Sequence, residues 1–313
     1  VTMDAVDHGK HIVMMNVECD VTIGSLLRQM AQNAGVVYSI AAGDEPGSIM
    51  ELYRFANAMG FEVVSAGKGK NNPLDVYATP DTVREKAQQR QMSPKMLCEF
   101  VDGSKTAVEM TAVSNMTGLI PDKRGMHGPR AGIEDIEKVF IPQEDGGVFS
   151  GRGRVDFGIG IHPGVFVVAA TDNDLIIRGM RDRDMGPGPY YRFYRPYHLT
   201  SVEVPLTVAQ GVIYGESTGH SFRTPVSEAI AVAKRDLEPG ERLDRIGEYC
   251  YRGSIERADI AREERLLPLG LAEGCVVKER IPKDTDITYD MVTMETETPL
   301  MQLRRLQDQL YWS

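Results

Sequence analysis

The sequence predicts an α/β fold joined to an α+β fold and a small all-β module, and three observations support this prediction. Between residues 11 and 65, short apolar runs alternate with amphipathic stretches of helical period, which is typical of βαβ units and a parallel sheet. From about Ser93 a helix comes first and strand-like runs follow, which is typical of a largely antiparallel sheet. After Ser227, short strands and Pro-Gly turns recur at regular spacing. We therefore predict three domains, over residues 1–92, 93–227 and 228–313.

The composition is that of a globular protein of two or three domains. The chain has 313 residues, of which 42% are hydrophobic and 26% are charged. The net charge of −10 argues against nucleic acid as a partner, because neutralising phosphates requires a basic surface. The four cysteines are far apart and form no CxxC pair, which indicates reduced thiols rather than disulfides or a zinc site. No apolar run approaches ~20 residues and no signal-peptide pattern is present, so we expect a cytoplasmic protein without a membrane partner.

The first domain is predicted from strands that alternate with helices. The expected order is a helix ending at Gly9, a strand over 11–17, a helix over 22–34, a strand over 36–41, a helix over 48–59 and a strand over 61–65. Ligands of a parallel sheet bind outside the carboxyl ends of its strands. Those ends carry Asn16, Glu18 and Asp20, then residues 43–46, and then a loop over 67–72. No GxGxxG turn follows the first strand, so the sheet either binds no dinucleotide or lacks the N-terminal half of a nucleotide-binding domain.

The stretch from Phe100 to Pro129 contains the residues best suited to chemistry. A strand-like tip is followed by a turn at residues 102–103 and a helix over 105–116. Lys105 and Glu109 are four residues apart, so they would stand side by side on that helix. They could form an ordinary surface ion pair, but the polar, Gly- and Pro-rich segment that follows favours a site for an anionic substrate.

The rest of the second domain is expected to form the sheet. Strands are predicted over 164–170, 190–197 and 200–204, and a helix over 205–214. Alternation along the second of these strands places Arg192 and Tyr194 on one face and Tyr191, Phe193 and Arg195 on the other. Arg192 and Tyr194 could clamp an anion, since a guanidinium binds phosphate through two hydrogen bonds and a phenol adds a donor. The alternative is a cation–π pair on a solvated face.

The third domain is predicted from two similar strand-and-turn segments, over 230–244 and 276–285. The final stretch, residues 299–313, has the pattern of a short amphipathic helix. It contains the only tryptophan, Trp312, which we expect to pack on a neighbouring element.

Eight strings in the sequence carry a family resemblance. They are HGKHIVMMNVECD, GDEP with ELY, AGKGKNNP, FVDGSKTAVEM, TGLIPDKRGMHGP, HPGVF, RPYHL and AKRDLEPGERLD, and they run over almost the whole chain. Through them the chain resembles the homoserine-dehydrogenase-like NAD(P)-dependent oxidoreductases with a C-terminal SAF domain. Within that family it is similar to the branch of 1-deoxy-D-xylulose 5-phosphate reductoisomerase-like (DRL) enzymes.

The resemblance implies a fold and a reaction. The fold would comprise the C-terminal half of a Rossmann-type parallel sheet, a central α+β catalytic and dimerisation domain, and a β-clip-like SAF module with a C-terminal helix. Since the family has a complete Rossmann domain, the resemblance implies that the N-terminal part of that domain is absent here. The reaction would form 2-C-methyl-D-erythritol 4-phosphate in isoprenoid biosynthesis, with NADPH (NAD as the alternative) and Mg²⁺ or Mn²⁺. The resemblance also implies a homo-oligomer built through the central domain.

Two positions depart from the homoserine dehydrogenases themselves. Their first strand ends in an Asn-Lys pair whose lysine serves the chemistry, whereas Asn16 is followed here by Val17. Their Asn-Gly-Thr turn has its counterpart in Asp102, Gly103 and Ser104. A homoserine dehydrogenase in the strict sense is therefore not expected.

The expected site residues fall into four groups. Catalytic candidates are Lys105, Glu109 and Asp102. Substrate-binding candidates are Lys68, Lys70, Asn71, Arg192, Tyr194 and His127, with His198 as a secondary candidate, although both histidines could be structural hydrogen-bonding residues. Cofactor-binding candidates are Asn16, Gly43, Asp44 and Glu45. Metal candidates are Glu18 and Asp20, whose hard oxygens suit Mg²⁺ or Mn²⁺, although two exposed carboxylates in a loop can also have no role.

Two other functions stay open. The first is a dehydrogenase of a sugar acid or hydroxy acid, which needs a hydride acceptor and a lysine but no metal. The second is a non-catalytic protein whose SAF module binds a saccharide or a protein partner. Sensitivity of the activity to a chelator would separate the first of these from a reductoisomerase.

Overall fold

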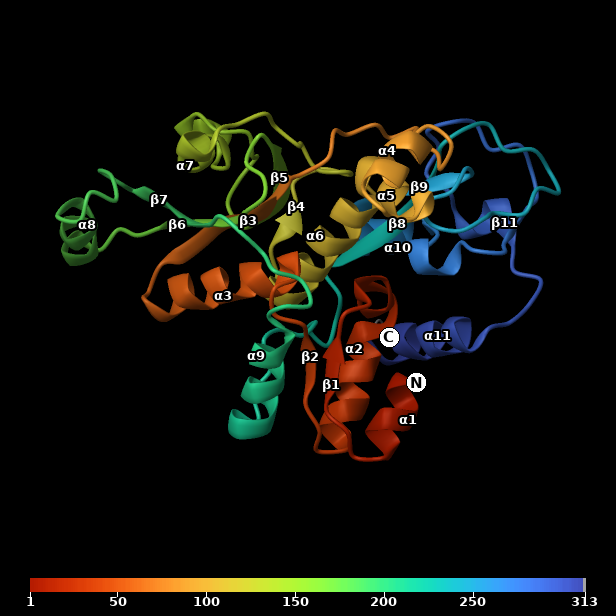
Figure 1. Cartoon of the computed structure of the whole chain (residues 1–313), viewed down its shortest axis with the longest axis horizontal. Coiled ribbons are helices and arrows are strands. Elements are labelled where there is room, and N and C mark those ends of the chain that lie inside the picture. Colours follow the sequence, from red (N-terminus) through yellow and green to blue (C-terminus); the bar gives the residue numbers. More distant parts are fainter. Residues whose placement is uncertain (312–313) are drawn as a thin grey trace. The chain divides into compact units, whose positions relative to one another are not determined.

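The computed structural model describes residues 1–311 (Figure 1), so the prediction for Trp312 lies outside the described residues. The chain divides into two compact units, and each is built from three separate segments. Unit 1 consists of Val1–Met15, Ala31–Asn71 and Val113–His220, and unit 2 of Asn16–Met30, Asn72–Ala112 and Ser221–Ser313. The chain therefore passes from one unit to the other five times. The division into three consecutive domains stays a prediction.

The helices and strands follow one another in a mixed α/β order (Figure 1). The elements up to residue 117 are α1 Thr2–Asp7, β1 Ile12–Met14, α2 Val17–Asn33, β2 Tyr38–Ile40, α3 Glu45–Ala58, β3 Glu62–Lys70, α4 Arg84–Gln89, α5 Pro94–Val101 and α6 Ser104–Thr117. Those up to residue 214 are β4 Ile120–Pro121, α7 Ile136–Val139, β5 Arg154–Ile159, β6 Val165–Ala170, α8 Asp174–Arg181, β7 Tyr190–Arg195, α9 Val204–Ala209 and the π-helical turn η3 Gln210–Tyr214. The remaining elements are β8 Ser227–Ala233, β9 Tyr251–Arg257, α10 Ala258–Glu263, β10 Val276–Val277, β11 Val292–Thr293 and α11 Pro299–Tyr311, with short 3₁₀ turns between.

The main sheet of unit 1 is mixed, with the strand order β4-β5-β3-β6-β7. Its central strand, β3, runs parallel to β5 and antiparallel to β6. The sequence placed residues 61–65 in one parallel sheet with the strands over 11–17 and 36–41, and this is wrong. Of these three strands, only β1 and β2 pair with each other, and they are parallel. An apolar run shows that a strand is buried but not which strand it pairs with, so periodicity alone could not make this distinction.

Strand β3 continues beyond its predicted end at residue 65, and the additional part contains two glycines. The segment AGKGK was expected to belong to a loop, but Gly67 and Gly69 lie inside the strand. A Cβ atom at Gly67 would lie 2.2 Å from the backbone oxygen of Asp156, and one at Gly69 would lie 2.4 Å from the backbone nitrogen of His162. Glycine is therefore required because neighbouring backbone approaches closely, which is a known use of glycine within strands.

Replacing Gly67 with alanine should destabilise the protein by about 1–3 kcal/mol or more, because the new methyl group has no space. The expected result is a lower midpoint of denaturant unfolding with an unchanged slope. A half-buried glycine in α8, Gly179, supplies the matched control, because a Cβ there would meet nothing closer than 3.7 Å. Equal midpoints for Gly67→Ala and Gly179→Ala would show that the close approach is not present in solution.

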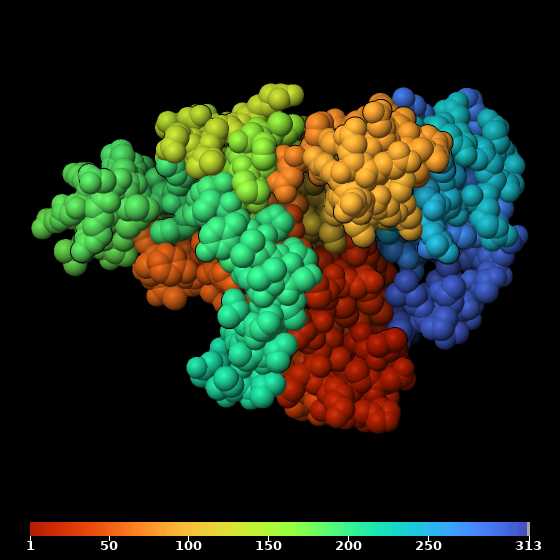
Figure 2. All heavy atoms as spheres, in the orientation of Figure 1, coloured from red at the N-terminus to blue at the C-terminus, as the bar shows by residue number. Residues whose placement is uncertain are grey.

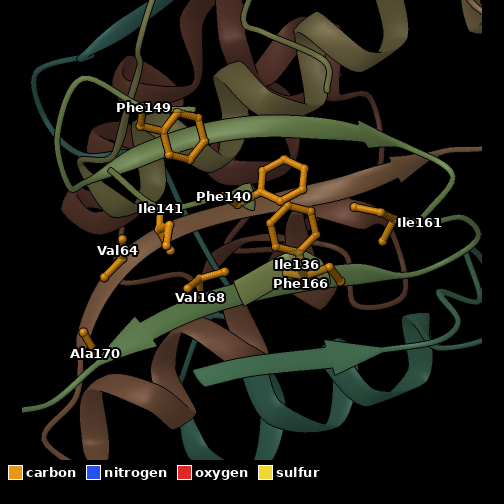
Figure 3. Packing of buried hydrophobic residues seen from close by; sticks show 9 residues of the cluster. All are labelled: Val64, Ile136, Phe140, Ile141, Phe149, Ile161, Phe166, Val168 and Ala170. Atoms are coloured by element: carbon orange, nitrogen blue, oxygen red, sulfur yellow. The ribbon is translucent and has the colours of Figure 1, made fainter. Parts of the chain in front are cut away.

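The two faces of the main sheet have different covers. On one face, α7 and its neighbouring loops pack against β6 and β7, and the cluster shown in Figure 3 fills the space between them. Its members include Phe140, Phe149 and Phe166, all fully buried. On the other face α3 contacts β3, β6 and β7, and Phe55 of α3 meets Phe193 edge to face at 5.4 Å between ring centroids. The predicted alternation along β7 is confirmed, since Phe193 lies on the α3 side and Arg192 bonds to Glu137 of α7.

Segment 200–214 combines a wrong prediction with a confirmed one. The strand expected over 200–204 is a turn, and the helix expected over 205–214 is present as α9 and η3. The pair forms part of the surface drawn in Figure 2. Its large apolar side chains are exposed, among them Leu206, Val208, Val212, Ile213 and Tyr214.

Unit 2 contains small antiparallel sheets and several helices. Strands β8 and β9 form one antiparallel pair, and β10 and β11 form another. A separate core joins α4 and α5 and contains Val83, Leu97 and Cys98. The strand-like tip expected at residue 100 is instead the end of α5, and the predicted turn at 102–103 is confirmed, with Gly103 at a φ of +91°. Among the described residues, no helix is both long and apolar enough to span a bilayer.

Candidate active site

The first residues of α3 place two carboxylates in the interior of unit 1. Asp44 occupies the N-cap position and Glu45 opens the helix, and both side chains are buried. Gly43, at a φ of +81°, packs against the segment that follows β7, because a Cβ there would lie 2.7 Å from the backbone oxygen of Leu199. Negative charge is favourable at a helix N-terminus, which suits this location to acids. The same charge disfavours a phosphate group there.

Lys68 of β3 reaches the first turn of α3. Its Nζ lies 2.5 Å from Oε1 of Glu45, and both side chains are only 8% exposed. His198 Nε2 lies 3.4 Å from the same oxygen. Burial alone would raise the pKa of Glu45, but Lys68 and His198 outweigh it, and the pKa lies well below its usual range. Asp44, Glu45, Lys68 and His198 therefore form a cluster of ionisable side chains, in which Lys68 hydrogen-bonds to Glu45 and His198 lies beside the same carboxylate.

His198 has an unusual environment within this cluster. Its Nδ1 atom is buried and has no hydrogen-bond partner among the described residues. A buried polar atom without a partner costs free energy, so such atoms are rare unless a ligand or water completes them. The ring therefore presents one nitrogen to Glu45, and its other nitrogen has no partner among the described residues.

Arg195 of β7 fixes the elements around this cluster. Its guanidinium donates to Ser48 and to Glu51 of α3, each at 3.0 Å, and pairs with Glu203 at 2.5 Å. Glu203 in turn accepts a hydrogen bond from the backbone of Leu199. These contacts hold the segment that carries His198 against α3.

The other residues expected to bind substrate are placed apart from this cluster or are engaged elsewhere. Lys70 is buried on β3, two residues after Lys68 and hence on the same face of the strand, while Asn71 is exposed at the strand end. Arg192 lies on the opposite face of the sheet, where Glu134 and Glu137 neutralise it. Tyr194 donates to the backbone oxygen of Ile161 at 3.0 Å.

His127 belongs to a different network in unit 1. Its Nε2 lies 2.8 Å from Asp122, which also accepts hydrogen bonds from Ser150 and Arg154. Burial alone would raise the pKa of Asp122, but these hydrogen bonds outweigh it and lower the pKa. The backbone of His127 donates to Asp156 at 2.9 Å. The histidine therefore holds the loop before β5.

In unit 2, Lys105 stands in the first turn of α6 and its Nζ lies 3.0 Å from Oε1 of Glu18. The two side chains are 19% and 28% exposed, so solvent reaches this pair. Glu109, one turn further along α6, is buried. Lys105 thus combines a fixed position with access from outside.

The predicted metal residues lie in a helix rather than a loop. Helix α2 begins at Val17, and the side chain of Asn16 accepts a hydrogen bond from the backbone of Cys19, as an N-cap residue does. Glu18 and Asp20 are two residues apart in this helix, so they face different sides. Asp20 is buried and accepts a hydrogen bond from Ser221. The two carboxylates therefore do not converge on one point.

Asp102 forms a buried ion pair with Lys234. Sequence reasoning missed this lysine, whose only signal was its place at the end of the apolar run AIAVAK. The two atoms, Lys234 Nζ and Asp102 Oδ2, are 2.7 Å apart, and the side chains are 2% and 0% exposed. Lys234 also donates to the backbone oxygens of Ala78 and Glu248. Asp102 accepts a hydrogen bond from the backbone of Ser104 and so fixes the start of α6.

A second group that sequence reasoning missed is Glu99 of α5. Burial, with a smaller contribution from the negative charge of Glu18, raises the pKa of Glu99 to about 7. Lys95 and Lys105 act in the opposite direction, and Asp102 adds to the increase. Glu99 therefore exchanges a proton near neutral pH. Its position on α5 gave no sign of this, because burial depends on the tertiary fold.

The raised pKa of Glu99 predicts a pH dependence of stability. Its ordinary pKa is 4.5, so between about pH 4.5 and 7 the native state binds more protons than the unfolded state, and stability falls as pH rises. Glu99→Gln should remove this component. We expect the variant to be more stable than the parent at about pH 8 and similar to it below about pH 4.5, as measured by urea unfolding. A difference that is equal at both pH values, or that the exposed control Glu85→Gln reproduces, would refute this assignment.

The comparisons with known proteins agree with an enzyme. A family model described as "Oxidoreductase DRL, catalytic domain" matches residues 43–204, just over half of the chain. The matched region includes Asp44, Glu45, Lys68, Lys105 and His198. No curated protein matches the chain.

Proposed function

This chain belongs to the DRL oxidoreductase family, and we propose on that premise that it is an NADPH-dependent, reductoisomerase-like enzyme. Its substrate would be 1-deoxy-D-xylulose 5-phosphate and its product 2-C-methyl-D-erythritol 4-phosphate. An oxidoreductase family suggests a nicotinamide cofactor, which supplies the hydride when bound. Binding of the substrate and transfer of protons would be carried out by side chains of this protein.

The observation that carries the proposal is the buried cluster around Glu45. It lies within the family match, and three of its ionisable members are buried: Asp44, Glu45 and Lys68. Buried charge is costly and adds little stability of its own, so its presence favours a functional reason. The unpartnered Nδ1 of His198 supports the same view, since a substrate hydroxyl or carbonyl could complete it.

The donor set fits a divalent metal. Carboxylate oxygens of Asp44 and Glu45 lie within 4.8 Å of one another, and Mg²⁺ and Mn²⁺ prefer such hard ligands. We assign these two carboxylates to the ion in place of Glu18 and Asp20. A divalent ion, when bound, polarises a carbonyl group. Lys68 keeps Glu45 ionised, and His198 orients a substrate oxygen.

Lysines have two further roles in the proposal. Lys70, buried on the same face of β3 as Lys68, and Asn71 at the strand end would contact the substrate phosphate. Lys105 would deliver a proton from its position against Glu18. The exposed apolar side chains of α9 and η3 support the proposed homo-oligomer, since such patches commonly mark interaction surfaces.

One observation favours a second candidate, a metal-free dehydrogenase of a sugar acid or hydroxy acid. Lys68 Nζ already pairs with Glu45 at 2.5 Å, so this carboxylate has a cationic partner without a divalent ion. In that case Lys68 and His198 would bind the hydroxyl group that is oxidised.

A chelator experiment on the full chain separates the two. Oxidation of NADPH would be followed spectroscopically with the phosphorylated ketose, before and after EDTA, and after adding Mn²⁺. We expect turnover that EDTA abolishes and Mn²⁺ restores. Turnover of a sugar acid or hydroxy acid that EDTA does not affect would favour the dehydrogenase. Absence of turnover with every substrate, combined with saturable saccharide binding, would favour a binding protein.

A further inference from the structure

A cavity of about 450 Å³ lies in unit 2, outside the residues that the family model matches. Helices α10 and α11 and the residues between β11 and α11 contribute to its wall. The apolar part of the lining includes Ala258, Ala261, Leu266, Leu271, Met294 and Met301. Small-molecule sites in proteins are typically cavities of this size with a mainly apolar lining. Methionine in such a wall adapts to ligands of different shape.

The charged part of the lining contains more arginines than carboxylates. Four arginines face two carboxylates, those of Glu228 and Asp308. Arg304 is buried and pairs with both of them, so its charge is compensated within the wall. The other three arginines of the lining are exposed: Arg262, Arg265 and Arg305.

These exposed arginines can exchange their present partners for a ligand. Arg265 pairs with Asp290 and Arg305 with Glu297, and all four side chains are about half exposed or more. Exposed ion pairs of this kind contribute little to stability, so replacing one partner with an anionic ligand costs little. Guanidinium groups bind carboxylates through two parallel hydrogen bonds.

We propose that this cavity binds a small amphipathic carboxylate, with its apolar body on the alanine, leucine and methionine wall and its carboxylate at the three exposed arginines. The volume corresponds to about fifteen water molecules at roughly 30 Å³ each, which accommodates a medium-length alkyl chain. The site is independent of the proposed oxidoreductase chemistry, because none of its lining residues lies within the match at 43–204.

Calorimetric titration of the full chain with octanoate and with octanol tests the proposal. The two probes share one alkyl chain and differ in charge. We expect octanoate to bind about tenfold more tightly than octanol, because it gains a charge-assisted hydrogen bond. Arg262→Gln combined with Arg305→Gln should remove this difference and leave octanol binding unchanged. Equal binding of both probes to the parent chain, or absence of octanoate binding, would overturn the proposal.

Two variants that fill the cavity test whether the probes bind inside it. Met294→Trp and Ala261→Phe should each weaken both probes at least tenfold, and Met294 lies in an irregular segment where a larger side chain is tolerated more easily. Ala58→Phe, at an exposed alanine of α3, is the control for an added aromatic group. Undiminished octanoate binding in a folded Met294→Trp variant would place the probe elsewhere and contradict the proposal.

Discussion

Replacing Lys105 with methionine is expected to lower kcat by about a hundredfold to ten-thousandfold, the usual range for loss of a positioned proton donor. Methionine keeps the length and the apolar stem of lysine and removes only the ammonium group. Because Lys105 is 19% exposed and its pair with Glu18 is accessible to solvent, the fold should lose little stability. Steady-state kinetics and a thermal unfolding curve on the same sample would measure both effects.

A matched control uses another lysine that pairs with a carboxylate in a helical segment. Lys138 of α7 lies 3.2 Å from Asp135, and both side chains are more than half exposed. Lys138→Met should keep the parent kcat. Lys105→Arg should retain the charge and the pair with Glu18 but lose most turnover, since arginine does not release its proton near neutral pH. Parent-like kcat in Lys105→Met would remove Lys105 from the proposed chemistry.

Replacing Lys234 with methionine should reduce the free energy of unfolding by about 3–5 kcal/mol, the cost of breaking a buried ion pair on one side. The variant leaves the carboxylate of Asp102, which is fully buried, without its cation. The pKa of Asp102 is already raised by burial, and Lys234 is the main group that counteracts this effect. Urea unfolding monitored by circular dichroism would measure the loss.

The double variant Lys234→Met with Asp102→Asn tests whether the unpaired charge causes the loss. The neutral amide can still accept the hydrogen bond from Ser104, so the double variant should be more stable than Lys234→Met alone. Lys278→Met, at an exposed lysine of unit 2, should change stability by only about 0.5 kcal/mol. If the double variant is less stable than the single one, the pair is not the source of the effect.

Local periodicity predicted most of the elements. Helices α3 and α6 and strands β6 and β7 lie close to their predicted ranges, because each has an apolar pattern of the correct period, whereas α2 begins five residues before its predicted start at residue 22. The pairing of β3 could not be predicted, since it depends on contacts with β5 and β6, which lie more than eighty residues away in the chain. The glycines at positions 67 and 69 were interpreted as part of a loop. They are instead required in β3 because neighbouring backbone packs closely against them.

For the site, too, sequence reasoning predicted residue types but not which residues contact one another. The oxidoreductase family is confirmed over residues 43–204, and Asp44, Glu45 and Lys68 were all named as site residues. Sequence reasoning assigned them to two different ligands, whereas Lys68 and Glu45 bond to each other. Glu99 and Lys234 were missed because their properties come from burial, which no local pattern reports. Residue types were therefore predictable, and their associations were not.

Because each of the two units is built from three separate segments, the order of synthesis on the ribosome affects folding. Domains made of one continuous segment can fold as soon as they emerge, N-terminal first. Here the last segment of unit 1 ends at His220, and unit 2 requires residues from the final segment that begins at Ser221. Stretches such as 16–30 therefore complete their packing only after the last segment, some two hundred residues later in the chain, has been made. We expect the nascent chain to depend on chaperones until translation reaches the last segment.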